Sequence, residues 1–159
     1  CAAVVAALPA PALARLRFGP QGDAALASLE SIEHPPVSSL FLGFRREDVG
    51  HPLDGFGMLV PEVECRAVLG VLFSSTLFPG RAPDGHVALT GLIGGTRNPD
   101  LAGLATDALA AAIEPDLRQL LGVRAPPVFR RHTFWPRAIP QYDLGYVRHL
   151  AAIAEVERA

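Results

Sequence analysis

The sequence has no lysine, only two cysteines, and a single tryptophan among its 159 residues. All 14 basic residues are therefore arginine, and with 16 acidic residues the formal net charge is −2. Proteins that bind nucleic acid or anionic lipid by charge carry a basic patch or a basic excess. This chain has no such excess, so neither kind of partner is expected from its charge.

Cys1 and Cys65 are isolated, and neither belongs to a C-x-x-C pair. This excludes a disulfide framework and a cysteine-type zinc site. No apolar run approaches the roughly 18 residues that a transmembrane helix requires. No basic segment leads into a short apolar one, as it would in a signal peptide. We therefore expect a cytoplasmic protein, and peripheral contact with a membrane stays open.

Apolar residues make up 50% of the sequence and charged residues 19%, which is enough apolar material for the core of one domain. The chain begins at Cys1 in a segment typical of a buried strand. Residues 146–159 form an amphipathic pattern that ends without the glycine or proline that commonly follows a helix. We therefore expect an internal fragment of a longer chain.

Short apolar segments bounded by glycine and proline predict five or six strands. The candidates are residues 2–8, 37–44, 55–60, 68–75, 86–93 and 126–134. The turn-rich connection over residues 79–85 predicts that the segments on either side of it form an antiparallel pair.

Apolar residues spaced three and four apart predict helices between these strands. They cover residues 12–18, the segment after Asp23, residues 107–121 and the segment from 143 onward, with a helical turn at Asn98-Pro99. Asp23, Asn98 and Thr106 are the expected N-caps, and Pro115 predicts a kink or a division into two helices. Because strands and helices do not alternate strictly, the fold class is α+β. We expect a mixed, largely antiparallel sheet with helices packed on one face.

Side chains that would carry out catalysis by themselves are not grouped in this sequence. The five histidines are scattered, and no pair stands four residues apart on a predicted helix. There is no G-x-S-x-G segment, and residues 91–96 (GLIGGT) lack the spacing of a phosphate-binding loop. We predict no catalytic side chain and no metal site. Glycines within the predicted strands would let a flat ligand approach the backbone.

Five blocks, in this order and spacing, resemble the FAD-dependent protoporphyrinogen and coproporphyrinogen oxidases of haem biosynthesis, within the flavin amine oxidase superfamily. They are residues 55–61 (GFGMLVP), 69–75 (LGVLFSS), 77–83 (LFPGRAP), 94–99 (GGTRNP) and 135–142 (WPRAIPQY). Residues 3–10 also resemble the strand that leads out of the family's FAD domain. The resemblance covers nearly the whole chain.

The resemblance implies an enzyme that oxidises protoporphyrinogen IX or coproporphyrinogen III to the porphyrin, with FAD as cofactor and dioxygen as acceptor. It divides the chain into an exit from the FAD domain (1–10), a substrate-binding domain (11–134) and a returning loop and helix (135–159). The family's N-terminal dinucleotide motif and C-terminal flavin segment do not occur in these residues. The isolated fragment is therefore expected to be inactive, and a homodimer stays open.

Residue roles follow from matched positions in the family. Leu59, Leu72 and Leu92 match positions that contact rings of the substrate, and core packing is the alternative for each. Trp135 matches a position against the flavin.

Four further residues have supporting roles under the same resemblance. Gln141 and Tyr142 would support the loop by hydrogen bonds. Arg81 and Arg97 would meet the carboxylates of the substrate, order turns or face solvent.

Two other interpretations stay open at this stage. The first is another enzyme of the same superfamily, phytoene-desaturase-like or amine-oxidising, although the WPRAIPQY block argues against it. The second is a non-enzymatic module that binds an apolar ligand, if the chain is complete. A dinucleotide fingerprint upstream of residue 1 would favour an enzyme over such a module.

Overall fold

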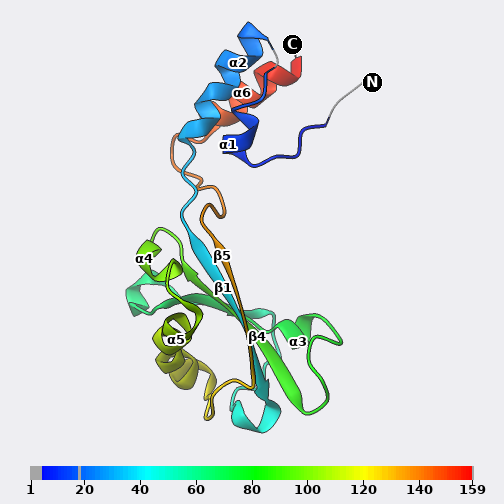
Figure 1. Ribbon diagram of the computed structural model, residues 1–159, viewed down its shortest axis with the longest axis vertical. Helices are drawn as coiled ribbons and strands as arrows, with labels where there is room; N and C mark the ends of the chain where they lie inside the picture. The colour runs from blue at the N-terminus through cyan, green and yellow to red at the C-terminus, as the bar shows by residue number, and fades with distance from the viewer. Residues whose placement is uncertain (1–4, 18, 159) are drawn as a thin grey trace. The chain divides into compact units, whose positions relative to one another are not determined.

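The computed structural model describes residues 5–17 and 19–158, which form two compact units. One unit combines the segment up to residue 34 with the segment from residue 139 onward, and the other contains residues 35–138 (Figure 1). The predicted division into parts of a flavin domain and a substrate domain stays a prediction.

The unit of residues 35–138 is built on a five-stranded sheet in the order β2-β3-β4-β1-β5. The strands are β1 (Val37–Arg45), β2 (Gly57–Leu59), β3 (Val68–Leu72), β4 (His86–Gly94) and β5 (Phe129–Trp135). All pairings between these strands are antiparallel, including the predicted pair of β3 and β4. The predicted α+β class with a largely antiparallel sheet is confirmed.

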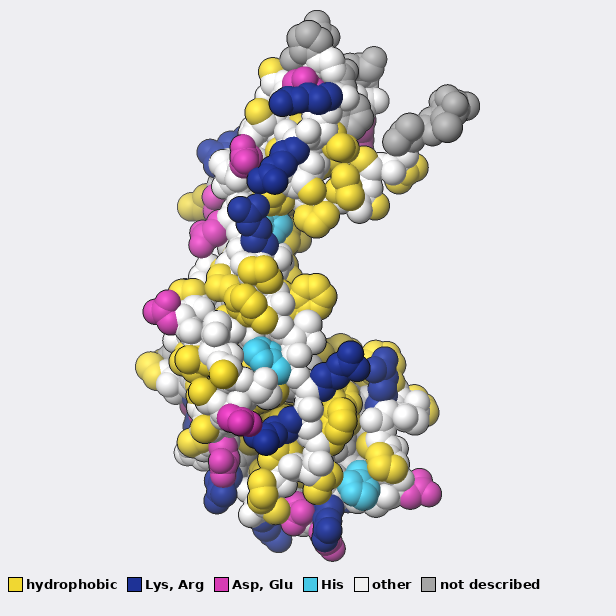
Figure 2. Space-filling model, viewed as in Figure 1, with side chains coloured by type: hydrophobic (Ala, Val, Ile, Leu, Met, Phe, Trp, Pro, Cys, Tyr) yellow, Lys and Arg dark blue, Asp and Glu magenta, His cyan; other side chains and the backbone are white. Residues whose placement is uncertain are grey.

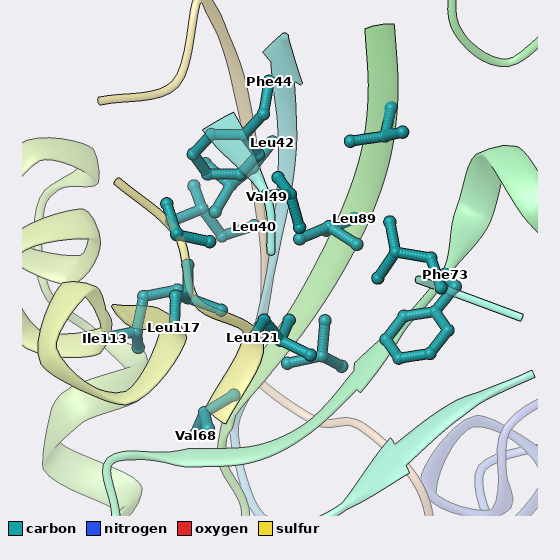
Figure 3. Close-up of a cluster of buried hydrophobic side chains, with 14 of the residues drawn as sticks. Leu40, Leu42, Phe44, Val49, Val68, Phe73, Leu89, Ile113, Leu117 and Leu121 are labelled. Carbon is teal, nitrogen blue, oxygen red and sulfur yellow. The ribbon is translucent and has the colours of Figure 1, made fainter. Parts of the chain in front are cut away.

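Helix α5 (Thr106–Leu121) covers one face of this sheet and closes the hydrophobic core (Figures 1 and 3). Its buried side chains recur at three- and four-residue spacing, and β1 alternates buried and half-buried residues along its length. Each pattern places apolar side chains on one side of its element. The core is made by Leu40, Leu42, Phe44, Val68, Val71, Leu89, Ile93, Leu109, Ile113, Leu117 and Leu121.

Two features of α5 differ from the predictions. Pro115 lies inside one continuous helix, so the predicted division into two helices is wrong, and the alternative of a kink stays a prediction. Pro115 and Ala111, the residue whose carbonyl loses its partner, are both exposed, so water can reach that carbonyl. The N-cap is Ala105, and Thr106 is the first helical residue. The predicted turn is confirmed as α4 (Pro99–Ala102), with Asn98 at its N-cap.

β3 ends three residues earlier than predicted, and a short helix, α3 (Ser74–Leu77), follows it. The Ser75 hydroxyl accepts a hydrogen bond from the backbone N–H of Ala88 (3.0 Å). The Ser74 and Thr90 hydroxyls are also hydrogen-bonded (2.7 Å). Hydroxyl groups of α3 thus hydrogen-bond to β4 at and beyond Thr90, the last residue of β4 that pairs with β3. Two 3₁₀ turns, η2 (Arg46–Asp48) and η3 (Glu62–Glu64), complete this unit.

The other unit contains α1 (Ala10–Leu13), α2 (Pro20–Ala27), the turn η1 (Ser28–Ser31) and α6 (Val147–Arg158). Leu26, Leu29 and Ile32 form its core, with Tyr146, Ile153 and Val156 packed against them. None of the helices in the described part of the chain has the length and apolar character needed to cross a membrane.

Three N-terminal predictions need correction. Of the predicted strand 2–8, residues 1–4 lie outside the described residues. The rest belongs to no strand, and Val5 is 92% exposed. A strand needs a partner for its backbone groups, and no described segment pairs with this one. The helices predicted for residues 12–18 and after Asp23 begin earlier. Each has a proline, Pro11 and Pro20, in its first turn, where a backbone N–H is not needed.

The start of β3 is fixed by Asp116, a buried residue of α5. Its Oδ2 accepts hydrogen bonds from the backbone N–H groups of Ala67 (3.0 Å) and Val68 (3.1 Å). Its Oδ1 lies 3.3 Å from a guanidinium nitrogen of Arg66. The strand register shifts between Val68 and Gly70, directly after this anchor. The carboxylate therefore holds the irregular start of the strand.

We expect Asp116→Ala to lower the free energy of unfolding by about 2–3 kcal/mol, because the buried N–H of Val68 and the partly buried N–H of Ala67 lose their acceptor. Urea denaturation followed by circular dichroism measures this loss. Glu114→Ala is the matched control, since Glu114 is exposed on the same helix and pairs with Arg118, four residues on. An exposed pair of this kind contributes at most about 0.5 kcal/mol. Equal losses in the two variants would contradict the anchoring role.

Candidate substrate-binding face

The three leucines predicted to bind substrate lie together on the sheet face that points away from α5. Leu59 opposes Gly70, which opposes Leu92 in the next strand. Leu72 is two residues from Gly70 and opposes Thr90. Residues directly opposed across strands, or two apart along one strand, point to the same side. The side chains of Leu59, Leu72 and Leu92 therefore share one face.

The same register continues this face across β1 and β5. Thr90 opposes Phe41, and Phe41 opposes Arg131. Phe129 and Trp135 lie two and four residues from Arg131 on the same strand, so they share its side. We call this surface the open face, defined by Phe41, Leu59, Leu72, Leu92, Phe129, Arg131 and Trp135.

Solvent exposure distinguishes the open face from the core. Leu59 is 84% exposed, and Leu72 and Leu92 are half-buried. In contrast, Val71 and Leu89, which point to the other face, are 1% and 0% exposed. The sequence left core packing as an alternative for the three leucines, and they are absent from the core cluster. Their contact with a substrate stays a prediction.

Two glycines bring β2 and β3 close together on the open face. A Cβ atom at Gly70 would lie 2.7 Å from the Met58 carbonyl oxygen and 3.0 Å from Cδ2 of Leu59. A Cβ atom at Gly57 would lie 2.4 Å from the Val71 carbonyl oxygen. Real Cβ atoms do not approach so closely, so these positions exclude side chains. The leucines opposite them project from a shallow surface that a flat ligand can approach.

A groove on the open face contains residues that sequence reasoning missed. Its volume is about 550 Å³, and it lies between the 80–83 loop and strands β1, β4 and β5. Phe41 and Phe129 line it with ring centroids 6.1 Å apart in an edge-to-face arrangement, and Arg81 and Arg131 also line it. In Figure 2, basic side chains lie among hydrophobic ones over the sheet-bearing unit. The period of two of a strand over residues 129–135 (FRRHTFW) is the signal that could have placed Arg131 and Phe129 on one side.

Trp135 is the last residue of β5 and opposes Val37, rather than belonging to the loop as predicted. β1 begins at Val37, so its first residue supplies the partner that extends β5 to residue 135. The indole is 53% exposed. It presents a flat aromatic surface at the end of the open face. Its predicted contact with the flavin stays a prediction.

The four residues with predicted supporting roles lie in different parts of the structure. Arg97 donates to the Val60 carbonyl (2.9 Å) and thereby orders the end of β2, as the turn-ordering alternative expected. Arg81 lies over the Phe78 ring (5.4 Å) at the groove. Gln141 and Tyr142 belong to the other unit: the Gln141 side chain donates to the Ile139 carbonyl, and Tyr142 contacts the Tyr146 ring.

A serine and a histidine pair in the sheet-bearing unit, but the serine is not an activated nucleophile. Ser38 is buried, and its hydroxyl donates to the Ala102 carbonyl (2.6 Å). Because the hydroxyl proton already forms this bond, it is not available to His132. His132 Nε2 lies 2.7 Å from Ser38 Oγ and must therefore donate to that oxygen. His132 Nδ1 then accepts from the Thr106 hydroxyl (3.2 Å). A general base would have to take a proton from serine, whereas this histidine gives one. The chain of hydrogen bonds ties α4 and α5 to the sheet.

Metal-binding side chains do not gather either: within residues 5–17 and 19–158, no cluster of three or more His, Cys, Asp or Glu could hold an ion. What the unit offers chemically is a shallow, mostly apolar surface with two guanidinium groups at one end. Such a surface binds and orients a ligand.

Comparison with known proteins agrees with the resemblance seen in the sequence. A family model for flavin containing amine oxidoreductases matches residues 1–154. The chain is 42% identical over 132 residues to protoporphyrinogen oxidase 2 of Arabidopsis thaliana, covering 81% of this chain and 26% of that protein. It is 32% identical over 151 residues to coproporphyrinogen III oxidase of Propionibacterium freudenreichii, covering 95% and 28%. The chain thus spans about a quarter to a third of the length of these relatives.

Among solved structures, the fold is similar to that of a protein from Exiguobacterium provisionally named protoporphyrinogen oxidase. The TM-score is 0.73 at 20% sequence identity, over 95% of this chain and 32% of that one.

Proposed function

Because the chain belongs to the flavin-containing amine oxidoreductase family, we propose that it forms the substrate-facing sheet of a porphyrinogen oxidase. The reaction would be the oxidation of protoporphyrinogen IX or coproporphyrinogen III to the porphyrin, with FAD as cofactor and dioxygen as acceptor. One observation carries the proposal. Leu59, Leu72 and Leu92, three residues at positions matched to the family's substrate contacts, lie on one face outside the core.

The residues of this chain bind and orient the macrocycle. The leucines contribute apolar contact, at roughly 25 cal/mol per Å² of surface removed from water. Gly57 and Gly70 keep the surface shallow between them. Contact of this kind excludes water from one side of the ligand. It requires no nucleophile and no metal.

One residue of this chain is suited to contact the cofactor. The half-exposed indole of Trp135 offers a flat surface and one N–H donor, which suit a flat heteroaromatic ring. The 159 residues contain no G-x-G-x-x-G loop for a pyrophosphate. Bound FAD would supply the hydride acceptor, and the open face would hold the ligand that gives up the hydride.

The single tryptophan provides the test. Its emission overlaps the strong near-ultraviolet absorption of a porphyrin, so a porphyrin held on the open face will quench it. We expect protoporphyrin IX to quench Trp135 fluorescence in the purified chain saturably, with one site per chain. A linear polyene of similar apolar surface is the control ligand, because it represents the substrate of a desaturase. Stronger quenching by the polyene, or no saturable quenching by the porphyrin, would contradict the proposed function.

A further inference from the structure

The groove on the open face has a charge pattern that the apolar contacts do not explain. Twelve residues line it, and among them are Arg81 and Arg131 but no aspartate or glutamate. Neither arginine forms an ion pair with a carboxylate of the described residues. The neighbouring Arg130 points to the opposite side of β5 and pairs with Asp107 at 2.9 Å. Of these two adjacent arginines on one strand, Arg130 thus has a carboxylate partner among the described residues and Arg131 does not.

Aromatic side chains stand beside these cations. Phe41 and Phe129 meet edge to face in the groove. His86 also lines it, and its Nδ1 donates to the Asp84 carbonyl, so Nε2 stays available to a ligand. The groove therefore combines a flat apolar wall with unpaired guanidinium groups, and a guanidinium group binds a carboxylate through two parallel hydrogen bonds.

We propose that this groove selects ligands by their carboxylates. Arg81 and Arg131 hold a carboxylate side arm of a tetrapyrrole, and Phe41 and Phe129 pack against its apolar part. This inference rests on the proposed function and deepens it, because it names the chemical group that the sheet recognises. It also assigns a role to Phe41, Phe129 and Arg131, which no matched motif position indicated.

The register of the sheet places the groove so that one ligand can use both surfaces. Leu72, Thr90, Phe41 and Arg131 lie in one cross-strand row. Neighbouring strands are about 4.8 Å apart, so Leu72 and Arg131 are separated by roughly 14 Å across three strand steps. A flat macrocycle over the leucines would reach toward the arginines with an extended acidic side arm.

The experiment compares protoporphyrin IX, which has two carboxylates, with its dimethyl ester, which has none. The readout is the quenching of Trp135 fluorescence in the purified chain. The unchanged chain is expected to bind the diacid at least about tenfold more tightly than the diester, the gain from one charge-assisted pair. Arg131→Gln and Arg81→Gln should each remove most of that preference and leave diester binding unchanged. Arg131→Lys should restore part of it, because lysine keeps the charge but not the fork.

Arg130→Gln is the matched control, since it removes a charge from the same strand on the opposite face. It should leave the preference for the diacid unchanged. If the two ligands bind equally and the Arg81 and Arg131 variants change nothing, the carboxylate site is overturned while the proposed function stands. If neither ligand quenches Trp135, the proposed function fails, and this inference fails with it.

Discussion

Leu72→Asp will weaken porphyrin binding by about tenfold or more without unfolding the protein. Leu72 lies in the middle of the open face, opposite Gly57 and Thr90. An aspartate there places a charge against the apolar surface of the ligand without a partner, which is unfavourable by at least 1–2 kcal/mol or roughly tenfold in affinity. Leu72 is only half-buried, so in the free protein water can solvate the new carboxylate.

This prediction is checked by titrating the variant with both the diacid and the diester. The loss should be similar for the two ligands, because the missing contact is apolar; the arginine variants should affect the diacid alone. Val63→Asp is the control: Val63 is 84% exposed on η3 and outside the sheet. Leu59→Ala should weaken binding in the same direction but less. Unchanged affinity would remove Leu72 from the binding surface, and loss of soluble protein would instead identify it as part of the core.

Gly94→Ala is expected to lower the free energy of unfolding by about 3–5 kcal/mol, through backbone strain and overpacking together. Gly94 has a φ of 111°, which side chains other than glycine rarely adopt. A Cβ atom there would lie 2.6 Å from both the Pro36 carbonyl oxygen and Cβ of Ala102. The end of β4 is thus packed between the entry to β1 and helix α4.

Urea denaturation measures this effect, and Gly55→Ala is its control. A Cβ atom at Gly55 meets nothing within 4 Å, and its φ lies outside the region that favours glycine. That variant should be neutral or slightly stabilising, since alanine restricts the unfolded chain. In Gly94→Ala/Ala102→Gly, one of the two close contacts is gone, so part of the stability should return. Equal stability of Gly94→Ala and Gly55→Ala would show that the backbone relaxes at residue 94.

The strands that form the centre of the sheet could be predicted from local pattern. Residues 37–44 and 86–93 are apolar segments bounded by proline and glycine, and both form central strands that pair with each other. Their boundaries moved by a single residue. Here local pattern and tertiary structure agree, because an apolar segment bounded by proline and glycine can supply the buried side chains of a strand without help from distant residues.

The face on which Leu59, Leu72 and Leu92 lie could not be derived from the sequence alone. A strand has a period of two, so one extra residue exchanges its two faces. β3 has such an irregularity between Val68 and Gly70, held by a carboxylate some 50 residues away in the chain. No pattern within residues 68–75 reports that contact.

The sequence also could not predict that Arg131 has no carboxylate partner among the described residues. Arg130 and Arg131 are chemically identical neighbours, and only the packing of α5 brings Asp107 to one of them. In the segment 5–8, the local pattern predicts a structure that does not form. Its composition favours a strand, but a strand exists only where another backbone supplies hydrogen bonds.

The position of β5 at the end of the strand order has a consequence for solubility. Only one side of β5 pairs with a described strand, so its outer backbone groups can accept a strand from another molecule. Arg130 and Arg131 stand in the middle of its seven residues, and charged side chains on an edge strand disfavour such pairing. We therefore expect these two guanidinium groups to disfavour edge-to-edge aggregation of the sheet.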